Sequence, residues 1–400
     1  MRILHTSDWH LGRTFHGVEL LADQRRALIG LAATVAAESV DVVVVAGDVY
    51  DRSVPSADAV AAYDEILAAI ASAGAQIVVS SGNHDSPTRL GAGAAFAAAG
   101  GLHLRTSVAQ IADPVLLADE YGAVAVYGIP YLEPETARHA LAVPDARDHQ
   151  GVLGAAMDRV RADLARRDVR SVVLAHAFVV GAAATGSERS ISVGGVETVA
   201  AETFAGVDYV ALGHLHSPQE VSAAVRYSGA PLPYSFAERS HRKAVWIVDL
   251  DADGLADVRR VEVPPVRGLS SLRGDLDALL ADPAHAAAED HYVEATLTDV
   301  VRPVDAMRRL RTRFPFAVHV EWERPHAGVG VDYRARVRGR GDLEIIDAFL
   351  TDVRDAPGKG ERVWIEKALR AVVGEPEATG VHTAIGEELT LFELPEQATA

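Results

Sequence analysis

The chain has 400 residues, 49% of them hydrophobic, and carries 38 Lys and Arg residues against 56 Asp and Glu residues, for a formal net charge of −18. This length and composition allow a large buried core and favour two or more globular domains. The sequence contains no cysteine, which excludes disulfides and thiolate metal sites.

Targeting signals are missing from the sequence. The first residues enter a strand-like run directly, without a charged leader, an apolar core or a cleavage site, and no apolar stretch is long enough to span a bilayer. We therefore expect a soluble cytoplasmic protein.

Up to about residue 250 the sequence alternates β-branched runs, polar turns and alanine-rich segments, and this alternation predicts a layered α/β fold. The expected strands cover residues 2–5, 42–46, 76–80, 124–127, 172–175, 207–212, 244–250 and 258–263. The expected helices cover residues 22–38, 56–72 and 152–167, with Ser56 as the N-cap and Gly74 as the stop of the second. Residues 251–254 predict a hairpin turn between the last two strands.

The remaining residues predict a second, smaller organisation. Pro264 and Pro265 cannot join a ladder and mark the end of a first domain, residues 1–263. We assign residues 266–323 to a small α+β module, with strands at 292–297 and 317–322 and a helix at 304–313. Residues 324–341, rich in Gly and Arg, predict a linker, and residues 342–374 predict two amphipathic helices, at 343–354 and 362–373, that are too small to fold alone. The acidic residues 375–400 predict a disordered tail.

Several expected strands are followed at once by polar side chains that suit metal binding. These side chains are Asp8 and His10, Asp48 and Asp51, Asn83 and His84, His176, and His214 with His216. Ligands bind at the carboxyl edge of the strands in open α/β sheets, so we expect these residues to converge. Gly47, Gly82 and Gly213 are expected to let the backbone turn sharply beside them.

Each of these residues also has an ordinary structural interpretation. Asp8 alone would be a turn former or a helix cap, Asn83 would tolerate a left-handed backbone, and His214 with His216 would be a satisfied surface pair. Their joint occurrence favours a shared site. Oxygen and imidazole ligands suit two divalent ions about 3.5 to 4 Å apart, which clamp an in-line displacement at phosphorus. Without thiolates, manganese or magnesium is favoured.

The motifs D-x-H, G-D-x-x-D, G-N-H-D, a single His and G-H-x-H occur in this order, and here the chain resembles the calcineurin-like metallophosphoesterases. The resemblance implies a β-sandwich flanked by helices. It also implies two metal sites that share a bridging Asp48: Asp8, His10, Asp48 and His216 for one ion, and Asp48, Asn83, His176 and His214 for the other.

The same resemblance implies roles beside the metals. His84 corresponds to the general acid or transition-state stabiliser, and Asp51 resembles the carboxylate that orients it. Arg52 stands where protein phosphatases carry a phosphate-binding arginine, and its alternative is an ordinary surface arginine.

Residues 7–13, 47–52, 82–86, 211–216 and 227–236 further resemble the SbcD family of bacterial nuclease subunits. That resemblance implies a Mn²⁺-dependent enzyme of DNA end processing, recombination, repair and replication, acting as a double-strand 3′-5′ exonuclease and as a single-strand and hairpin endonuclease. It implies an SbcC-type coiled-coil ATPase as partner, docked by the helices in residues 342–374. The 266–323 module would cap the site, and residues 56–72 and 87–99 would form a homodimer within a heterotetramer.

The acidic net charge opposes this function, because Lys and Arg supply most of the affinity for DNA phosphates. Bound divalent cations and a basic partner would offset it. One alternative is a phosphatase or cyclic-nucleotide phosphodiesterase, which would need neither the extra module nor the terminal helices. Another is a catalytically dead scaffold, which the presence of every expected ligand disfavours. The terminal helices could instead pack on their own domain.

Overall fold

The computed structural model describes residues 1–179, 182, 198–323, 337–353 and 356–373. Most of the predicted linker and all of the predicted tail lie outside these described residues. By its contacts the chain divides into two units, Met1–Arg324 and Pro325–Ala400.

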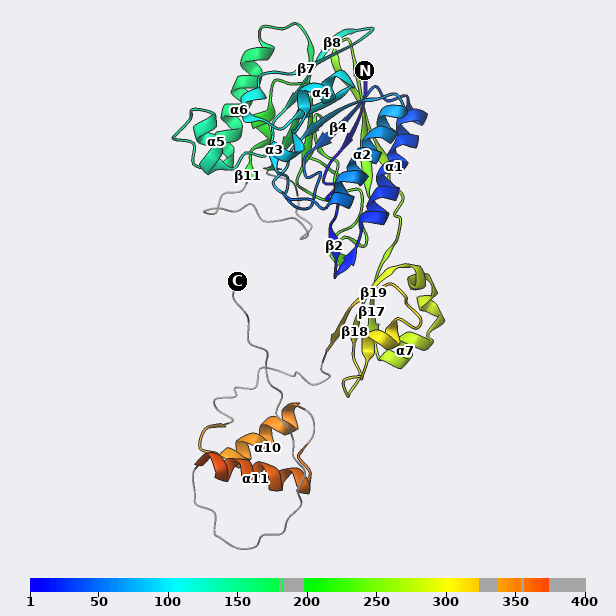
Figure 1. Ribbon diagram of the computed structural model, residues 1–400, viewed down its shortest axis with the longest axis vertical. Coiled ribbons are helices and arrows are strands. Elements are labelled where there is room, and N and C mark those ends of the chain that lie inside the picture. Colours follow the sequence, from blue (N-terminus) through cyan, green and yellow to red (C-terminus); the bar gives the residue numbers. More distant parts are fainter. Residues whose placement is uncertain (180–181, 183–197, 324–336, 354–355, 374–400) are drawn as a thin grey trace, which may run out of the picture. The chain divides into compact units, whose positions relative to one another are not determined.

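The first unit contains two six-stranded sheets packed face to face, with helices on both outer faces (Figure 1). One sheet has the order β16 (Gly254–Glu262), β15 (Ala244–Asp251), β1 (Arg2–Thr6), β4 (Val42–Ala46), β5 (Gln76–Ser80), β6 (Leu102–Arg105). The other has the order β13 (Gln219–Glu220), β14 (Val225–Tyr227), β12 (Tyr209–Gly213), β9 (Arg170–His176), β8 (Gly122–Gly128), β7 (Val115–Asp119). Helices α1 (Leu21–Glu38) and α2 (Ala57–Ser72) pack on the first sheet, and α5 (Pro134–Ala140) and α6 (His149–Leu164) pack on the second. The predicted sandwich flanked by helices is confirmed.

Short elements complete this part of the unit. They are β2 (Thr14–Phe15), β3 (Val18–Glu19), α3 (Pro87–Leu90), α4 (Ala94–Ala99), η1 (Val108–Gln110), β10 (Phe178–Val179), β11 (Thr198–Val199), η2 (Ala201–Phe204) and η3 (Phe236–Glu238).

Burial on both faces explains why the central strands stand out in the sequence. In β4, Val43 and Val45 pack against the helices, whereas Val42 and Val44 face the other sheet. Strands buried on both faces are nearly continuous apolar runs. Strands β1, β4, β5 and β6 run parallel in the first sheet, and β14, β12, β9 and β8 run parallel in the second. The carboxyl ends of these parallel strands meet at one edge.

Most predicted elements of the first domain are confirmed, including the hairpin turn between β15 and β16 and the N-cap of α2, where the Ser56 side chain accepts a hydrogen bond from the Ala59 N–H. Helix α6 begins at His149 rather than at residue 152, because the Asp148 carboxylate caps it by accepting from the Gly151 N–H at 2.8 Å. Residues 87–99, the second candidate dimer segment, do not form one continuous helix. Gly93 at φ 75° separates the short helices α3 and α4.

Residues 269–323 form a separate three-stranded parallel sheet of β17 (Leu269–Gly274), β18 (Tyr292–Leu297) and β19 (Ala317–Trp322), with α7 (Leu276–Ala281), η4 (Pro283–Asp290) and α8 (Ala306–Leu310). Helix α8 is shorter than predicted at both ends. It begins at Ala306 because Asp305 precedes it in a left-handed conformation, φ 54°, and it ends at Leu310. The Tyr292 hydroxyl donates to Asp23 Oδ2 of α1 at 3.0 Å, so this module contacts the first domain. We keep the domain boundary at Pro264 and Pro265 as a proposal.

The second unit contains α10 (Asp342–Val353) and α11 (Lys359–Val373). Arg362 of α11 pairs with Asp347 of α10 at 2.6 Å. No helix in the described part of the chain has the length and apolarity needed to cross a membrane.

Candidate metal centre

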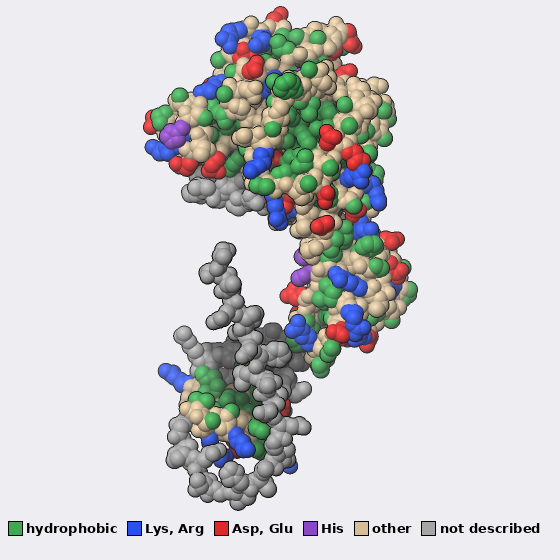
Figure 2. Space-filling model, in the orientation of Figure 1, with side chains coloured by type: hydrophobic (Ala, Val, Ile, Leu, Met, Phe, Trp, Pro, Cys, Tyr) green, Lys and Arg blue, Asp and Glu red, His purple; other side chains and the backbone are tan. Residues whose placement is uncertain are grey.

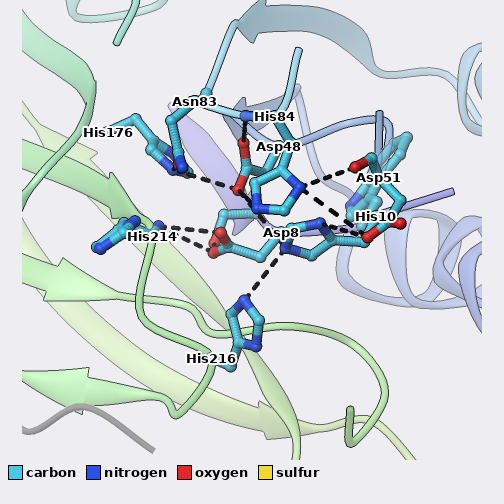
Figure 3. Close-up of polar contacts among 12 residues, drawn as sticks. Asp8, His10, Asp48, Asp51, Asn83, His84, His176, His214 and His216 are labelled. Atoms are coloured by element: carbon cyan, nitrogen blue, oxygen red, sulfur yellow. Dashed lines mark hydrogen bonds and ion pairs between the residues drawn. The ribbon is translucent and has the colours of Figure 1, made fainter. Parts of the chain in front are cut away.

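The candidate ligands come together at the carboxyl ends of parallel strands from both sheets (Figure 3). The residues follow β1 (Asp8, His10), β4 (Asp48), β5 (Asn83, His84) and β12 (His214, His216), and His176 ends β9. The convergence expected from strand order is therefore present, with every one of these side chains buried except half-buried Asn83.

The backbone at the site is strained in a consistent way. Asp8, His10, Asp48 and His214 all have positive φ, between 46° and 104°, although none is a glycine. Such conformations cost about 1–3 kcal/mol each and persist only where the surroundings enforce them. The Asp8 N–H donates to Gly47 O at 3.1 Å and the His10 N–H donates to Asp48 O at 2.9 Å, so the loops after β1 and β4 hold each other.

Glycine is required by close packing at all three positions predicted beside the site, Gly47, Gly82 and Gly213. Only Gly47 also has the positive φ, 84°, that a sharp turn of the backbone would need. A Cβ atom at Gly82 would lie 2.1 Å from Asp48 Oδ1, and one at Gly213 would lie 1.9 Å from Ala46 O. Any larger residue there would displace the loops that carry the candidate ligands.

Three overlapping groups of ligand atoms lie within 4.8 Å of one another: Asp8 with His10 and His216, Asp8 with Asp48 and His176, and His10 with Asp48 and His84. Asp48 Oδ2 lies 3.5 Å from Nε2 of His10 and 3.5 Å from Nε2 of His176. This carboxylate thus stands between the two halves of the cluster, where a bridging ligand would be.

The donor set fits divalent cations. Nε2 of His10 and Nε2 of His216 face each other at 3.1 Å, within hydrogen-bond distance, so both imidazoles present a nitrogen to the same place. Neutral imidazole nitrogens are common metal ligands. His176 Nδ1 donates to Ala46 O at 3.0 Å and turns its Nε2 towards Asn83 Oδ1, also at 3.0 Å. A carbonyl behind a histidine in this way fixes the ring for metal binding.

Burial and charge set the pKa values of these groups. Burial lowers the pKa of His10 well below its usual range, which keeps the ring neutral. Burial also raises the pKa of Asp8 to about 7, with the Asp48 charge adding to the rise. Burial also opposes ionisation of Asp48, but the neighbouring imidazoles, His176 above all, outweigh burial and hold the pKa of Asp48 well below its usual range. In the same way burial lowers the pKa of His176, but the charge of Asp48 outweighs burial and raises that pKa to about 9. The proton on His176 is thus held by the charge of Asp48. A metal ion that binds these two groups displaces such a proton.

His84 lies at the margin of the cluster. Its Nδ1 donates to the main-chain oxygen of Asp51 at 2.8 Å, and its Nε2 is 4.0 Å from Asp48 Oδ2. The Asp51 carboxylate is farther from this ring, 4.0 Å from Nδ1, and nearer to Nδ1 of His10, at 3.6 Å. The hydrogen bond that orients His84 therefore comes from the Asp51 carbonyl.

His214 and Arg52 are the candidates least engaged with the cluster. Among the described residues, none of the three ligand groups includes His214. Its N–H donates to Asp8 Oδ1 at 3.0 Å and its ring stands edge-on to His176, with centroids 5.3 Å apart. The Arg52 side chain is 74% exposed, with Nε 3.9 Å from Asp51 Oδ2.

Some residues around the site were not found from the sequence. The Asp85 carboxylate accepts from the N–H groups of Val49, Tyr50 and Gly82 and so ties the β4 and β5 loops together. Gln24 of α1 donates to His10 O at 2.7 Å and supports the β1 loop. Asp85 could have been found from the sequence, because it is the last residue of the G-N-H-D motif. Gln24 could not, because it lies inside a predicted helix and belongs to no motif.

Comparison with known proteins agrees with this geometry. Residues 1–218 match the calcineurin-like phosphoesterase family, and the chain belongs to that family. Residues 265–354 match the type 5 capsule protein repressor C-terminal domain. The chain is 29% identical over 317 residues to the SbcD subunit of the SbcCD nuclease of Staphylococcus epidermidis, and the match covers 79% of this chain and 83% of that protein.

Two solved structures share 14% identity with the chain, a protein of Thermus thermophilus and a dimetal phosphatase from Danio rerio. Each match covers 66% of this chain and 99% of the other, with TM-scores of 0.39 and 0.40. The family and the ligand cluster together support a centre for two divalent metal ions.

Proposed function

We propose that the chain is a Mn²⁺-dependent DNA nuclease that works with an SbcC-type ATPase. The observation that carries the proposal is the buried cluster of carboxylates and imidazoles at the sheet edge, with His84 beside it. Similarity to the SbcD subunit of an SbcCD nuclease along 79% of the chain supports the choice of DNA as substrate. The activities proposed are 3′-5′ exonuclease action on double-strand ends and endonuclease action on single strands and hairpins.

In this proposal Asp8, His10, Asp48 and His216 hold one ion, and Asp48, Asn83, His176 and His214 hold the other. When bound, the ions supply a hydroxide at neutral pH and stabilise charge on the phosphate oxygens. Ligands that are all oxygen or imidazole favour manganese or magnesium over thiophilic metals, and manganese is the proposed ion.

His84 is proposed to protonate or stabilise the departing oxygen. Its Nδ1 is held by the Asp51 carbonyl, so Nε2 faces the cluster and can carry the transferred proton. Arg52, exposed at the rim, is proposed to contact a phosphate of the incoming strand.

The helical pair α10 and α11 is proposed to dock the ATPase. Both helices expose large apolar side chains, with Phe349 55% and Trp364 72% exposed, and apolar atoms reach the surface of this pair in Figure 2. A pair of short helices cannot bury such side chains alone. A DNA substrate and this partner would place the protein in the cytoplasm.

A homodimer is proposed through α2 and the α3–α4 segment. Phe96 of α4 is 88% exposed, and aromatic side chains are enriched in the cores of protein–protein interfaces. Two such chains with two ATPase subunits would make the heterotetramer.

The test is cleavage of a labelled hairpin-ended DNA duplex by the purified chain with Mn²⁺, with and without the ATPase. We expect Mn²⁺-dependent cleavage that EDTA abolishes and that the ATPase stimulates. A chain that hydrolyses p-nitrophenyl phosphate with Mn²⁺ but leaves every DNA substrate intact would instead be a phosphatase, and the proposal would be wrong.

A further inference from the structure

A buried ion pair lies directly behind the candidate metal centre. Lys243 Nζ is 2.5 Å from Glu238 Oε2, and the two side chains are 2% and 0% exposed. Neither residue belongs to the proposed ligand sets. Lys243 is also unusual in the sequence, because only three of the 38 basic residues are lysines and the other two, Lys359 and Lys367, lie in α11.

Both members of the pair reach His216. Lys243 Nζ donates to the main-chain oxygen of His216 at 2.7 Å. Glu238 Oε1 lies 4.0 Å from His216 Nδ1, within range of an ionic attraction and beyond that of a hydrogen bond. The other ring nitrogen, Nε2, faces His10 Nε2 in the ligand cluster. The imidazole thus has one nitrogen towards the cluster and the other towards a buried carboxylate.

The position of the pair in the fold makes it a rigid support. Glu238 ends η3, and Lys243 immediately precedes β15, which pairs with β1 over residues 246–249. Strand β1 leads directly into Asp8 and His10. The pair therefore connects the His216 loop to the strand system that carries the other ligands of the same proposed metal site.

Stability does not explain such a pair. Desolvating two charges is so costly that replacing a buried ion pair by apolar residues of similar volume is often neutral or stabilising. A carboxylate beside a metal-binding histidine, by contrast, attracts the proton of the ring nitrogen that faces it and so leaves the other nitrogen free to bind metal. Loss of such outer partners weakens metal binding by roughly 10–100-fold.

We propose that Glu238 and Lys243 are positioning residues that hold His216 as a metal ligand, Glu238 through the ring and Lys243 through the His216 carbonyl and the Glu238 carboxylate. This inference rests on the proposed function only in requiring that the cluster binds divalent metal. It assigns a role to two residues that lie outside the metal-binding motifs.

The test compares four variants of the full chain by calorimetric titration with Mn²⁺ and by thermal unfolding without metal. Glu238→Gln and Lys243→Met each disrupt the pair, and the double variant Glu238→Leu/Lys243→Met replaces it by apolar side chains. Glu262→Gln removes one carboxylate of an exposed ion pair, with Arg242, on the neighbouring strand and is the matched control.

We expect one of the two Mn²⁺ sites to bind about 10–100-fold more weakly in Glu238→Gln and in the double variant, while Glu262→Gln binds as the unaltered chain does. The double variant should unfold close to the temperature of the unaltered chain, since no buried charge is left unpaired. If a single variant does not fold, the double variant carries the comparison.

A double variant that binds both Mn²⁺ ions with unaltered affinity would show that the pair does not position His216 for metal binding, and would overturn the inference alone. An unaltered chain that binds no Mn²⁺ would overturn the proposed function and the inference together.

Discussion

At the scale of single residues, the site depends on backbone positions that few side chains tolerate. Asp8, His10, Asp48 and His214 are all held at positive φ, at a cost of about 1–3 kcal/mol each. The hydrogen bonds between the β1 and β4 loops enforce two of these conformations. The rigidity of the cluster therefore comes from main-chain contacts as much as from the ligands themselves.

Replacing His84 separates catalysis from metal binding. His84→Ala should lower the rate of Mn²⁺-dependent DNA cleavage by about 10²–10⁴-fold, the usual contribution of a positioned acid or base, and leave Mn²⁺ affinity unchanged. Single-turnover cleavage of a labelled duplex and Mn²⁺ titration measure the two effects. His139→Ala, on the exposed end of α5, should cleave as the unaltered chain does, and undiminished cleavage by His84→Ala would refute the catalytic role.

The motifs in the sequence were sufficient to predict that the candidate residues lie at one edge of the sheets, because each ends or follows a strand whose apolar run is evident; their roles as ligands stay predictions. They were not sufficient for Glu238, Lys243 or Gln24, whose partners are set only by tertiary packing. The orienting group of His84 was expected to be the Asp51 carboxylate, yet the hydrogen bond comes from the carbonyl of the same residue. A main-chain carbonyl is present in every residue, so its use as a hydrogen-bond acceptor cannot be predicted from the residue type.

At the scale of elements, the predicted strands were the most dependable part of the fold, since burial on both faces makes them continuous apolar runs. Edge strands such as β6 and β7 are partly exposed and were missed. The candidate dimer segment at residues 87–99 is divided at Gly93, whose left-handed backbone ends a helix that alanine would continue.

Removing α10 and α11 should separate nuclease activity from partner binding. A chain truncated after Gly341 should cleave simple duplex ends as the full chain does in the absence of the ATPase, because the candidate ligands all lie in Met1–Arg324. It should no longer co-purify with the SbcC-type ATPase, because it lacks Phe349 and Trp364.

The control for this truncation is a chain ending at Val373, which keeps both helices and should retain the ATPase. If the chain truncated after Gly341 still co-purified fully with the ATPase, the docking surface would have to lie in the first unit and the assignment to α10 and α11 would be wrong.

At the scale of the whole molecule, the net charge of −18 has to be reconciled with a DNA substrate. On the face drawn in Figure 2, acidic and basic side chains of the described residues are interspersed rather than gathered by sign. Part of the acidity is the cluster itself, where Asp8 and Asp48 lie buried among imidazoles, and under the proposed function divalent cations bound there would invert the local charge. The remaining DNA affinity is assigned to the ATPase partner under the proposed function.

The central claim is that one buried cluster holds two metal ions. An anomalous diffraction map recorded at the manganese edge from crystals of the chain grown with Mn²⁺ tests it directly. We predict two peaks about 3.5–4 Å apart, one bordered by Asp8, His10 and His216, the other by Asn83, His176 and His214, with Asp48 between them. A single peak, or peaks away from Asp48, would contradict the account.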